Sequence, residues 1–140
     1  MYPNCQEYIY SILPQVPLEL IHTAIPLVKD RGIRFKHILP VDSLIPKQSE
    51  EFFEKEGYKD LIQKGKVERR MVNSAYIGLV VTENQAMIMF PNLKGQADMN
   101  FSFCNNKSSD EGLFHDRCID YFFHIWNNSR TFDEVKLKKV

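Results

Sequence analysis

The alternation of apolar and polar residues along the chain predicts strands separated by helices. Residues 7–13 and 33–40 are predicted strands, and between them apolar residues recur at helical spacing over 18–28. Pro26 predicts a kink or a break in that helix, and Gly32, which follows a basic last turn, predicts its end. A β-α-β unit of this kind implies two parallel strands that are buried on both faces.

The rest of the pattern predicts further strands and one long helix. In chain order it indicates a helix capped by Ser49 and ended by Gly57, a helical turn ending at Gly65, a charged strand over 66–72, a hairpin over 78–90 with Asn84 and Gln85 at its tip, and a strand over 96–105. Together these elements predict an α/β fold with a mixed sheet, a β-α-β start and a central hairpin.

A long amphipathic helix near the C-terminus is the clearest element. Ser108 and Glu111 have the spacing of a capping box, and the apolar residues that follow form one broad stripe ending at Trp126. Residues 131–140 are mostly charged and are predicted to be loosely held. We therefore expect one domain over residues 1–130 and a charged tail.

Composition narrows the class of protein. The chain has 140 residues, 44% of them hydrophobic and 26% charged, with a formal net charge of zero, which is typical of a soluble globular domain without a basic face for nucleic acid. No apolar run has the length of a membrane span, and the N-terminus lacks a signal-peptide pattern. Three cysteines without Cys-x-x-Cys spacing indicate reduced thiols and no zinc site. The expected location is the cytoplasm, with no membrane partner and no cofactor.

Five segments carry a resemblance to a known family: "RGIRFKHILP", "VERRMV", "GLVVTENQAMIMFP", "KGQAD" and "LFHDRCIDYFFHIW". Their order resembles half of a phospholipase D-like domain and, more closely, the middle domain of the methanogenesis regulatory protein family of archaeal winged-helix transcription regulators. The resemblance spans Tyr8 to Arg130. It implies a small-molecule-sensing domain that forms a homodimer and reaches DNA only through a winged helix. No winged helix occurs in this chain, so we expect an isolated sensor or a piece of a longer regulator.

The residues of phospholipase D chemistry are missing from the hairpin where that superfamily places them. The reaction needs a histidine nucleophile, a lysine two residues later and an acid five residues after the lysine. The residues at these positions are Ala75, Ile77 and Thr82 in one register and Tyr76, Gly78 and Glu83 in the next. We therefore predict that the protein is not an enzyme. His115 and His124 lie on opposite sides of the last helix, and they are not expected to share a metal ion.

Polar residues within the predicted strands suggest a binding site. Arg34, Lys36, His37, Glu68, Arg69 and Arg70 interrupt segments that would be nearly all apolar if both faces were buried. One interpretation is an edge strand, or a Glu68–arginine pair. The other is a ligand pocket at the carboxyl ends of the strands. Its predicted residues are His37, Arg70, Tyr76, Asp98, Asn100, Phe101 and Tyr121, with Phe103 and Phe122 as further apolar wall. An arginine in such a pocket suits a carboxylate or a phosphate, so the organic effector has an anionic group as one option.

Three functions remain open from the sequence. The first is effector sensing and dimerisation in a transcription regulator. The second is an enzyme with a degenerate phospholipase D-like hydrolase site that uses His37 or Asp98 as acid or base. The third is a protein-association module without a pocket. Trp126 could pack in the core or across a dimer interface.

Overall fold

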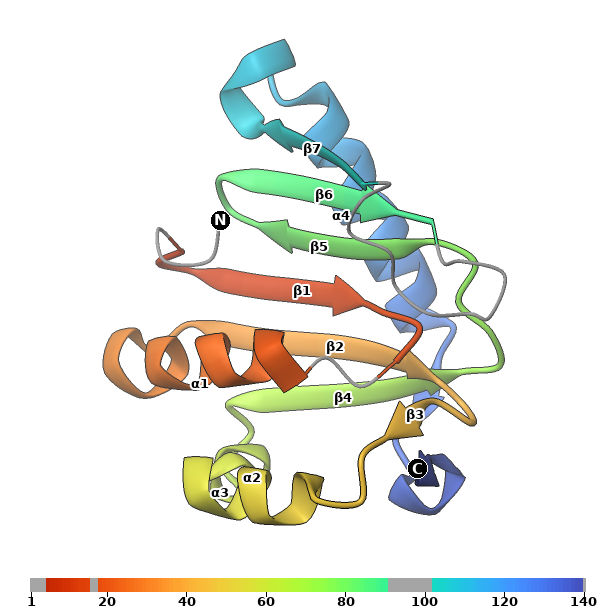
Figure 1. The fold of residues 1–140 in the computed structure, drawn as a ribbon. Coiled ribbons are helices and arrows are strands. Elements are labelled where there is room, and N and C mark those ends of the chain that lie inside the picture. The colour runs from red at the N-terminus through yellow and green to blue at the C-terminus, as the bar shows by residue number, and fades with distance from the viewer. Residues whose placement is uncertain (1–4, 16–17, 91–101, 140) are drawn as a thin grey trace.

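The structure is a computed structural model that describes residues 5–15, 18–90 and 102–139. Its elements, in chain order, are β1 (Tyr8–Ile12), α1 (Leu18–Arg31), β2 (Arg34–Pro40), β3 (Leu44–Ile45), α2 (Ser49–Glu56), α3 (Tyr58–Gln63), β4 (Val67–Val72), β5 (Gly78–Thr82), β6 (Gln85–Met89), β7 (Ser102–Asn106), the 3₁₀ helix η3 (Lys107–Asp110), α4 (Leu113–Asn127), β8 (Arg130–Thr131), the 3₁₀ helix η4 (Glu134–Lys136) and β9 (Lys138–Lys139). Figure 1 shows how they are arranged.

Within the described ranges, a seven-stranded mixed sheet has the order β7-β6-β5-β1-β2-β4-β8. The pairs β1·β2 and β2·β4 are parallel, and the remaining pairs are antiparallel. Strands β3 and β9 form a separate two-stranded sheet. The predicted α/β fold with a mixed sheet is confirmed.

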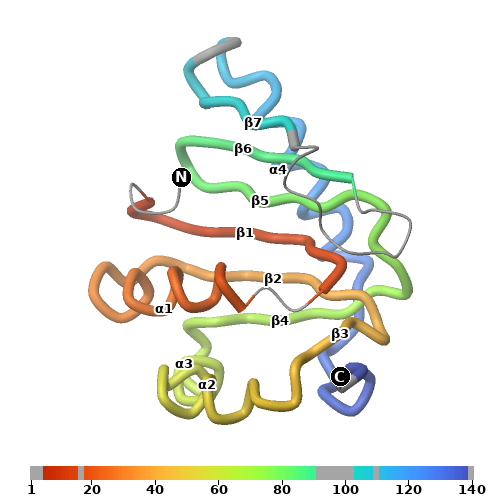
Figure 2. The backbone as a smooth tube through the Cα atoms, in the orientation of Figure 1, coloured from red at the N-terminus to blue at the C-terminus, as the bar shows by residue number. Residues whose placement is uncertain are grey.

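The β-α-β start follows the sequence closely. Helix α1 is continuous through Pro26, and Gly32 ends it with a φ of 66°, a conformation that suits glycine. Figure 2 traces the crossover from β1 through α1 into β2. The predicted parallel pairing of the two strands is confirmed, with Tyr8 opposite Arg34.

The sheet has a helical layer on each face. Helices α1, α2 and α3 cover one face of the β1–β2–β4 half, and α4 crosses the other face (Figure 1). On the first face the core is made by side chains such as Ile21, Phe35 and Tyr58. On the second face Phe122 of α4 packs in one cluster with Tyr10 and Ile38 of the sheet. Because the side chains of a strand point alternately to the two faces, consecutive residues within β2, and consecutive residues within β4, belong to different layers.

The N-terminus of α4 differs from the predicted capping box. The chain forms the 3₁₀ helix η3 over Lys107–Asp110, and α4 begins only at Leu113. Between them Glu111 (φ 61°) and Gly112 (φ 82°) both have left-handed backbones. These two left-handed residues separate η3 from α4, so Ser108 and Glu111 do not cap one continuous helix. The capping-box prediction is therefore wrong.

The C-terminal arm (residues 130–139) packs on the domain and is not a loose tail. Its strand β8 pairs with Arg70 and Met71 of β4, and β9 pairs with β3. Phe132 and Leu137 pack against the core beneath α1. The prediction that this segment is loosely held is therefore wrong.

Candidate functional site

The hairpin β5–β6 turns at Glu83 and Asn84, one residue earlier than predicted. The hydroxyl of Thr82 accepts hydrogen bonds from the backbone N–H groups of Asn84 (3.3 Å) and Gln85 (3.2 Å), which fixes the turn. Thr82 itself is buried. The Thr82 hydroxyl is therefore used by the turn, and the residue supplies no carboxylate in place of the catalytic acid.

Glu83 also has a structural partner. Its carboxylate accepts hydrogen bonds from the backbone N–H groups of Gln6 and Tyr8 and from the thiol of Cys5. Burial alone would raise the pKa of Glu83, but hydrogen bonds from backbone N–H groups, with that of Gln6 the largest, outweigh it and lower the pKa. The hairpin acid therefore holds the segment that leads into β1.

We expect Glu83→Gln to lower the free energy of unfolding by about 1–2 kcal/mol, because hydrogen bonds to a charged acceptor are replaced by weaker ones. Urea unfolding at pH 7 measures the loss. Since the folded-state pKa is lowered, the wild-type advantage is present above the unfolded pKa and disappears as the pH falls through the folded one. The matched control is Glu54→Gln on the exposed side of α2. An equal change in both variants would contradict the role of Glu83.

In the second register Gly78 stands where phospholipase D chemistry needs a lysine, and the structure leaves no room for a side chain at this position. A Cβ atom built on Gly78 would lie 2.5 Å from Cγ of Met89, on the neighbouring strand. Ile77 and Tyr76 lie in the segment before β5, and the Tyr76 side chain is 82% exposed. Neither register therefore presents a histidine and a lysine at the hairpin.

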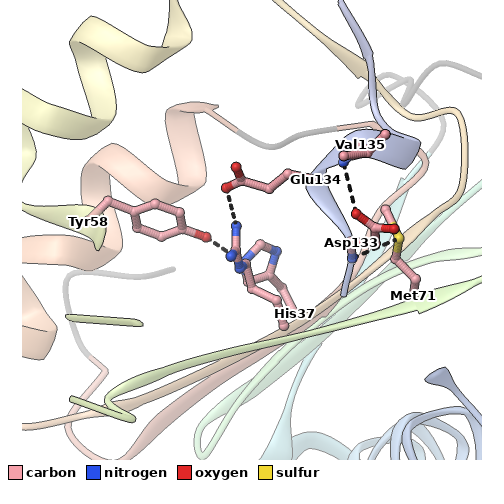
Figure 3. Close-up of polar contacts among 7 residues, drawn as sticks. His37, Tyr58, Met71, Asp133, Glu134 and Val135 are labelled. Atoms are coloured by element: carbon pink, nitrogen blue, oxygen red, sulfur yellow. Dashed lines mark hydrogen bonds and ion pairs between the residues drawn. The ribbon is translucent and has the colours of Figure 1, made fainter. Parts of the chain in front are cut away.

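His37 lies in the interior, on the face of the sheet covered by α1 to α3. Its Nε2 is 2.6 Å from the hydroxyl of Tyr58, and its Nδ1 has no hydrogen-bond partner among the described residues. Figure 3 shows His37 and Tyr58 pointing toward one another. Burial and the nearby Arg69 guanidinium lower the pKa of His37 to about 3, so the ring is neutral. Burial likewise raises the pKa of Tyr58.

A small cavity lies beside this pair. It has a volume of about 20 Å³, and about 10–15 Å³ is needed for one water molecule. Glu134, from the C-terminal arm, lines it and forms an ion pair with Arg69 (3.2 Å). The cavity can hold a water molecule but is too small for an organic effector.

Arg70 lies on the opposite face and lines a much larger cleft of about 610 Å³. The cleft follows the outer edge of β4, where β8 pairs with only two residues. Its lining residues are Lys36, Ile62, Val67, Glu68, Arg69, Arg70, Trp126, Thr131 and Phe132. The cleft is broad and open to solvent. Hence the cleft runs along a strand edge, whereas the sequence placed a pocket at the carboxyl ends of the strands.

The structure does not gather the predicted ligand residues into one pocket. Arg70 lines the cleft, while His37 lines the small cavity on the other side of the sheet. Tyr121 is 39% exposed on α4 and, like Tyr76, does not line the cleft. The predictions for Asp98, Asn100 and Phe101 lie outside the described residues.

Two residues of the cleft had no place in the predicted pocket. Lys36, one of the charged residues within the predicted strands, forms an ion pair with Glu68 on β4. The predicted Glu68–arginine pair is thus a Glu68–lysine pair. Trp126 packs within its own chain, stacked on Phe122 with 5.8 Å between ring centroids. The sequence feature that points to this cleft is the run of charged residues in strands that would otherwise be apolar.

Other candidate chemistry is not supported in the described part of the chain. His115 is buried, and its Nε2 donates to the Thr82 carbonyl (2.6 Å). The residues that the structure describes contain no cluster of His, Cys, Asp or Glu that could hold a metal ion. Cys5, Cys104 and Cys118 are free thiols, and only Cys104 is exposed. No helix among the described residues is both long and apolar enough to cross a bilayer.

Comparison with solved structures finds a similar fold in two proteins, TrmBL2 and NucT. The first structure is TrmBL2, an archaeal chromatin protein whose structure shows a novel mode of DNA binding. It has a TM-score of 0.61 and 16% identity over 94% of this chain. This chain spans 47% of TrmBL2, about half of its length.

The second structure is NucT from Helicobacter pylori, with a TM-score of 0.58 and 14% identity over 94% of this chain and 86% of NucT. At these identities the likeness establishes the fold alone. No protein-family model matches the chain, and no curated protein does.

Proposed function

We propose that this domain is the small-molecule-sensing and dimerisation domain of an archaeal transcription regulator, related to the methanogenesis regulatory protein family. The observation that carries the proposal is the cleft of about 610 Å³ beside β4, in a phospholipase D-like fold whose hairpin offers no nucleophile. Such a domain recognises a ligand without transforming it. The similarity to TrmBL2 supports the link to DNA-binding proteins. With a net charge of zero, DNA contact would come from a different domain.

A regulator of this kind works only if its effector binds two arrangements of the protein with different affinities. The cleft has one wall from the sheet, at Arg70, and one from the C-terminal arm, at Thr131 and Phe132. Because β8 is held to β4 by only two residue pairs, an occupant of the cleft can change how the arm is seated. The arm would then carry the signal to neighbouring domains or to the second copy in a homodimer.

The test is thermal unfolding of the purified chain with a panel of metabolites that includes organic anions. A ligand at a concentration one hundred times its dissociation constant should stabilise the fold by about 2.7 kcal/mol. Sedimentation velocity should show a homodimer. If no compound stabilises the protein, the third function, a module for protein association alone, gains support.

A hydrolase with a degenerate site is the second candidate, and the similarity to NucT favours it. His37, one of its proposed acid–base residues, is only 1% exposed and is hydrogen-bonded to Tyr58. We expect no hydrolysis of bis(p-nitrophenyl) phosphate or of DNA above the buffer rate. Steady turnover that is lost in His37→Ala, with the fold intact by circular dichroism, would support the hydrolase and contradict effector sensing.

A further inference from the structure

We propose that the cleft beside β4 binds the acidic head of an organic effector, a carboxylate or a phosphate, between Arg70 and Lys36. The inference rests on the proposed function, since it names the chemical class of the effector and the groups that hold it.

Among the residues that the structure describes, Arg70 is a half-buried cation without an anionic partner. Its Nε donates to the Ser129 hydroxyl (2.6 Å) and its Nη2 to the Ser129 carbonyl (2.7 Å). Among the described residues, the carboxylates of the charged cluster pair with other cations: Glu68 with Lys36 and Glu134 with Arg69. Withdrawing a charge from water is costly unless an opposite charge meets it. Arg70 also has more N–H donors than the two bonds use, so it can accept an anion without losing its anchor.

A second cation lies close by. Lys36 is on β2, on the same face of the sheet as Arg70, and its Nζ lies 4.8 Å from the centroid of the Trp126 ring. The guanidinium carbon of Arg70 lies 5.6 Å from the same centroid. The Lys36 ammonium already contacts Glu68, but it has further donors. Two cations are thus directed at one indole, and with the Glu68 carboxylate beside Lys36 these three side chains leave a net charge of about one positive unit in this corner of the cleft.

The rest of the lining fits the body of an organic molecule. The Thr131 residue, on β8, adds a hydroxyl near the cationic corner. The indole of Trp126 supplies aromatic surface beside the two cations, whereas Ile62 and Phe132 line the part of the cleft on the other side of β4. A lining of this kind matches an acid with an apolar or aromatic body better than it matches a sugar or a bare inorganic ion.

The test uses Trp126, the single tryptophan of the chain, as a fluorescence reporter in the cleft. Phenyl phosphate and benzoate are titrated separately, so that the phosphate and carboxylate arms are distinguished, with inorganic phosphate as a third probe. At least one organic probe should change the emission saturably. In Arg70→Gln its dissociation constant should rise by about tenfold or more, because a charge-assisted contact is lost.

Three controls make the result specific. Benzyl alcohol has the aromatic body without the charge and should not saturate the signal. Arg117→Gln removes an exposed arginine of α4 that does not line the cleft, and it should leave the dissociation constant unchanged. Lys36→Gln should weaken binding in the same direction as Arg70→Gln, and it serves as the test if Arg70→Gln does not fold.

Two outcomes would overturn the inference: no saturable signal with either organic probe, or a dissociation constant that neither substitution alters. Its failure is separable from failure of the proposed function. If a metabolite stabilises the protein equally in wild type and Lys36→Gln, the domain still senses a ligand and only this site is wrong. If no metabolite stabilises the wild type, the proposed function itself fails.

Discussion

Replacing Phe122 with alanine is expected to lower the free energy of unfolding by about 3–5 kcal/mol, the usual cost of removing a large aromatic side chain from a core. Phe122, on the side of α4 that faces the sheet, is 0% exposed. Its ring stacks on Tyr10 (4.9 Å between centroids) and on Trp126 (5.8 Å), and it meets Phe123 edge to face (5.2 Å). Losing it removes the centre of the packing that joins α4 to β1, and urea unfolding at neutral pH measures the cost.

The neighbouring residue provides a matched control. Tyr121 precedes Phe122 on the same helix but is 39% exposed, and Tyr121→Ala should cost less than about 1 kcal/mol. Similar losses in the two variants would show that α4 does not pack on the sheet through Phe122. Since Trp126 stacks on Phe122, Phe122→Ala should also shift the tryptophan emission to longer wavelength, which ties the core to the cleft.

The parts of the fold that could be predicted are those with a local signal. The apolar stripe of α4 and the spacing over α1 follow from the period of a helix, and Gly32 marks an end that favours a left-handed backbone. The parts that could not be predicted depend on distant partners. The two-residue strands β8 and β9 exist only because β4 and β3 lie beside them. A charged sequence such as residues 131–139 gives no sign of those partners.

In the candidate site, too, some features have a local signal in the sequence and others depend on contacts between distant segments. Of the two charged strands, β4 has only the two-residue strand β8 on its outer side, whereas β2 lies inside the sheet between β1 and β4. The sequence did not give the register between β2 and β4, in which His37 lies opposite Arg69. A one-residue difference in register moves a side chain to the other face of the sheet. For this reason His37 and Arg70, predicted to converge, are separated by the sheet.

The last prediction concerns acid. Below about pH 6.5 the free energy of unfolding should fall by about 1.4 kcal/mol for each pH unit through His37 alone, reaching about 2 kcal/mol at pH 5. Burial, and then the positive charge of Arg69, lower the pKa of folded His37 to about 3. The unfolded chain therefore binds the proton first, and the folded state loses stability as the pH falls from the ordinary value of 6.5 toward 3. Tyr58 cannot offset this, since burial raises its pKa and it stays neutral.

Urea unfolding at pH values from 7 to 5 isolates the effect, because most carboxylates still keep their charge in that range. His37→Gln should be less stable than wild type at pH 7, since the contact with Tyr58 is weakened, but its stability should depend less on pH. His22→Gln is the control. That histidine lies on the surface, with 64% of its side chain exposed, so the variant controls for the loss of a histidine that is not buried. An unchanged slope in His37→Gln would mean that His37 is not held neutral in the interior. It would reopen its use as an acid–base group, and with it the hydrolase alternative.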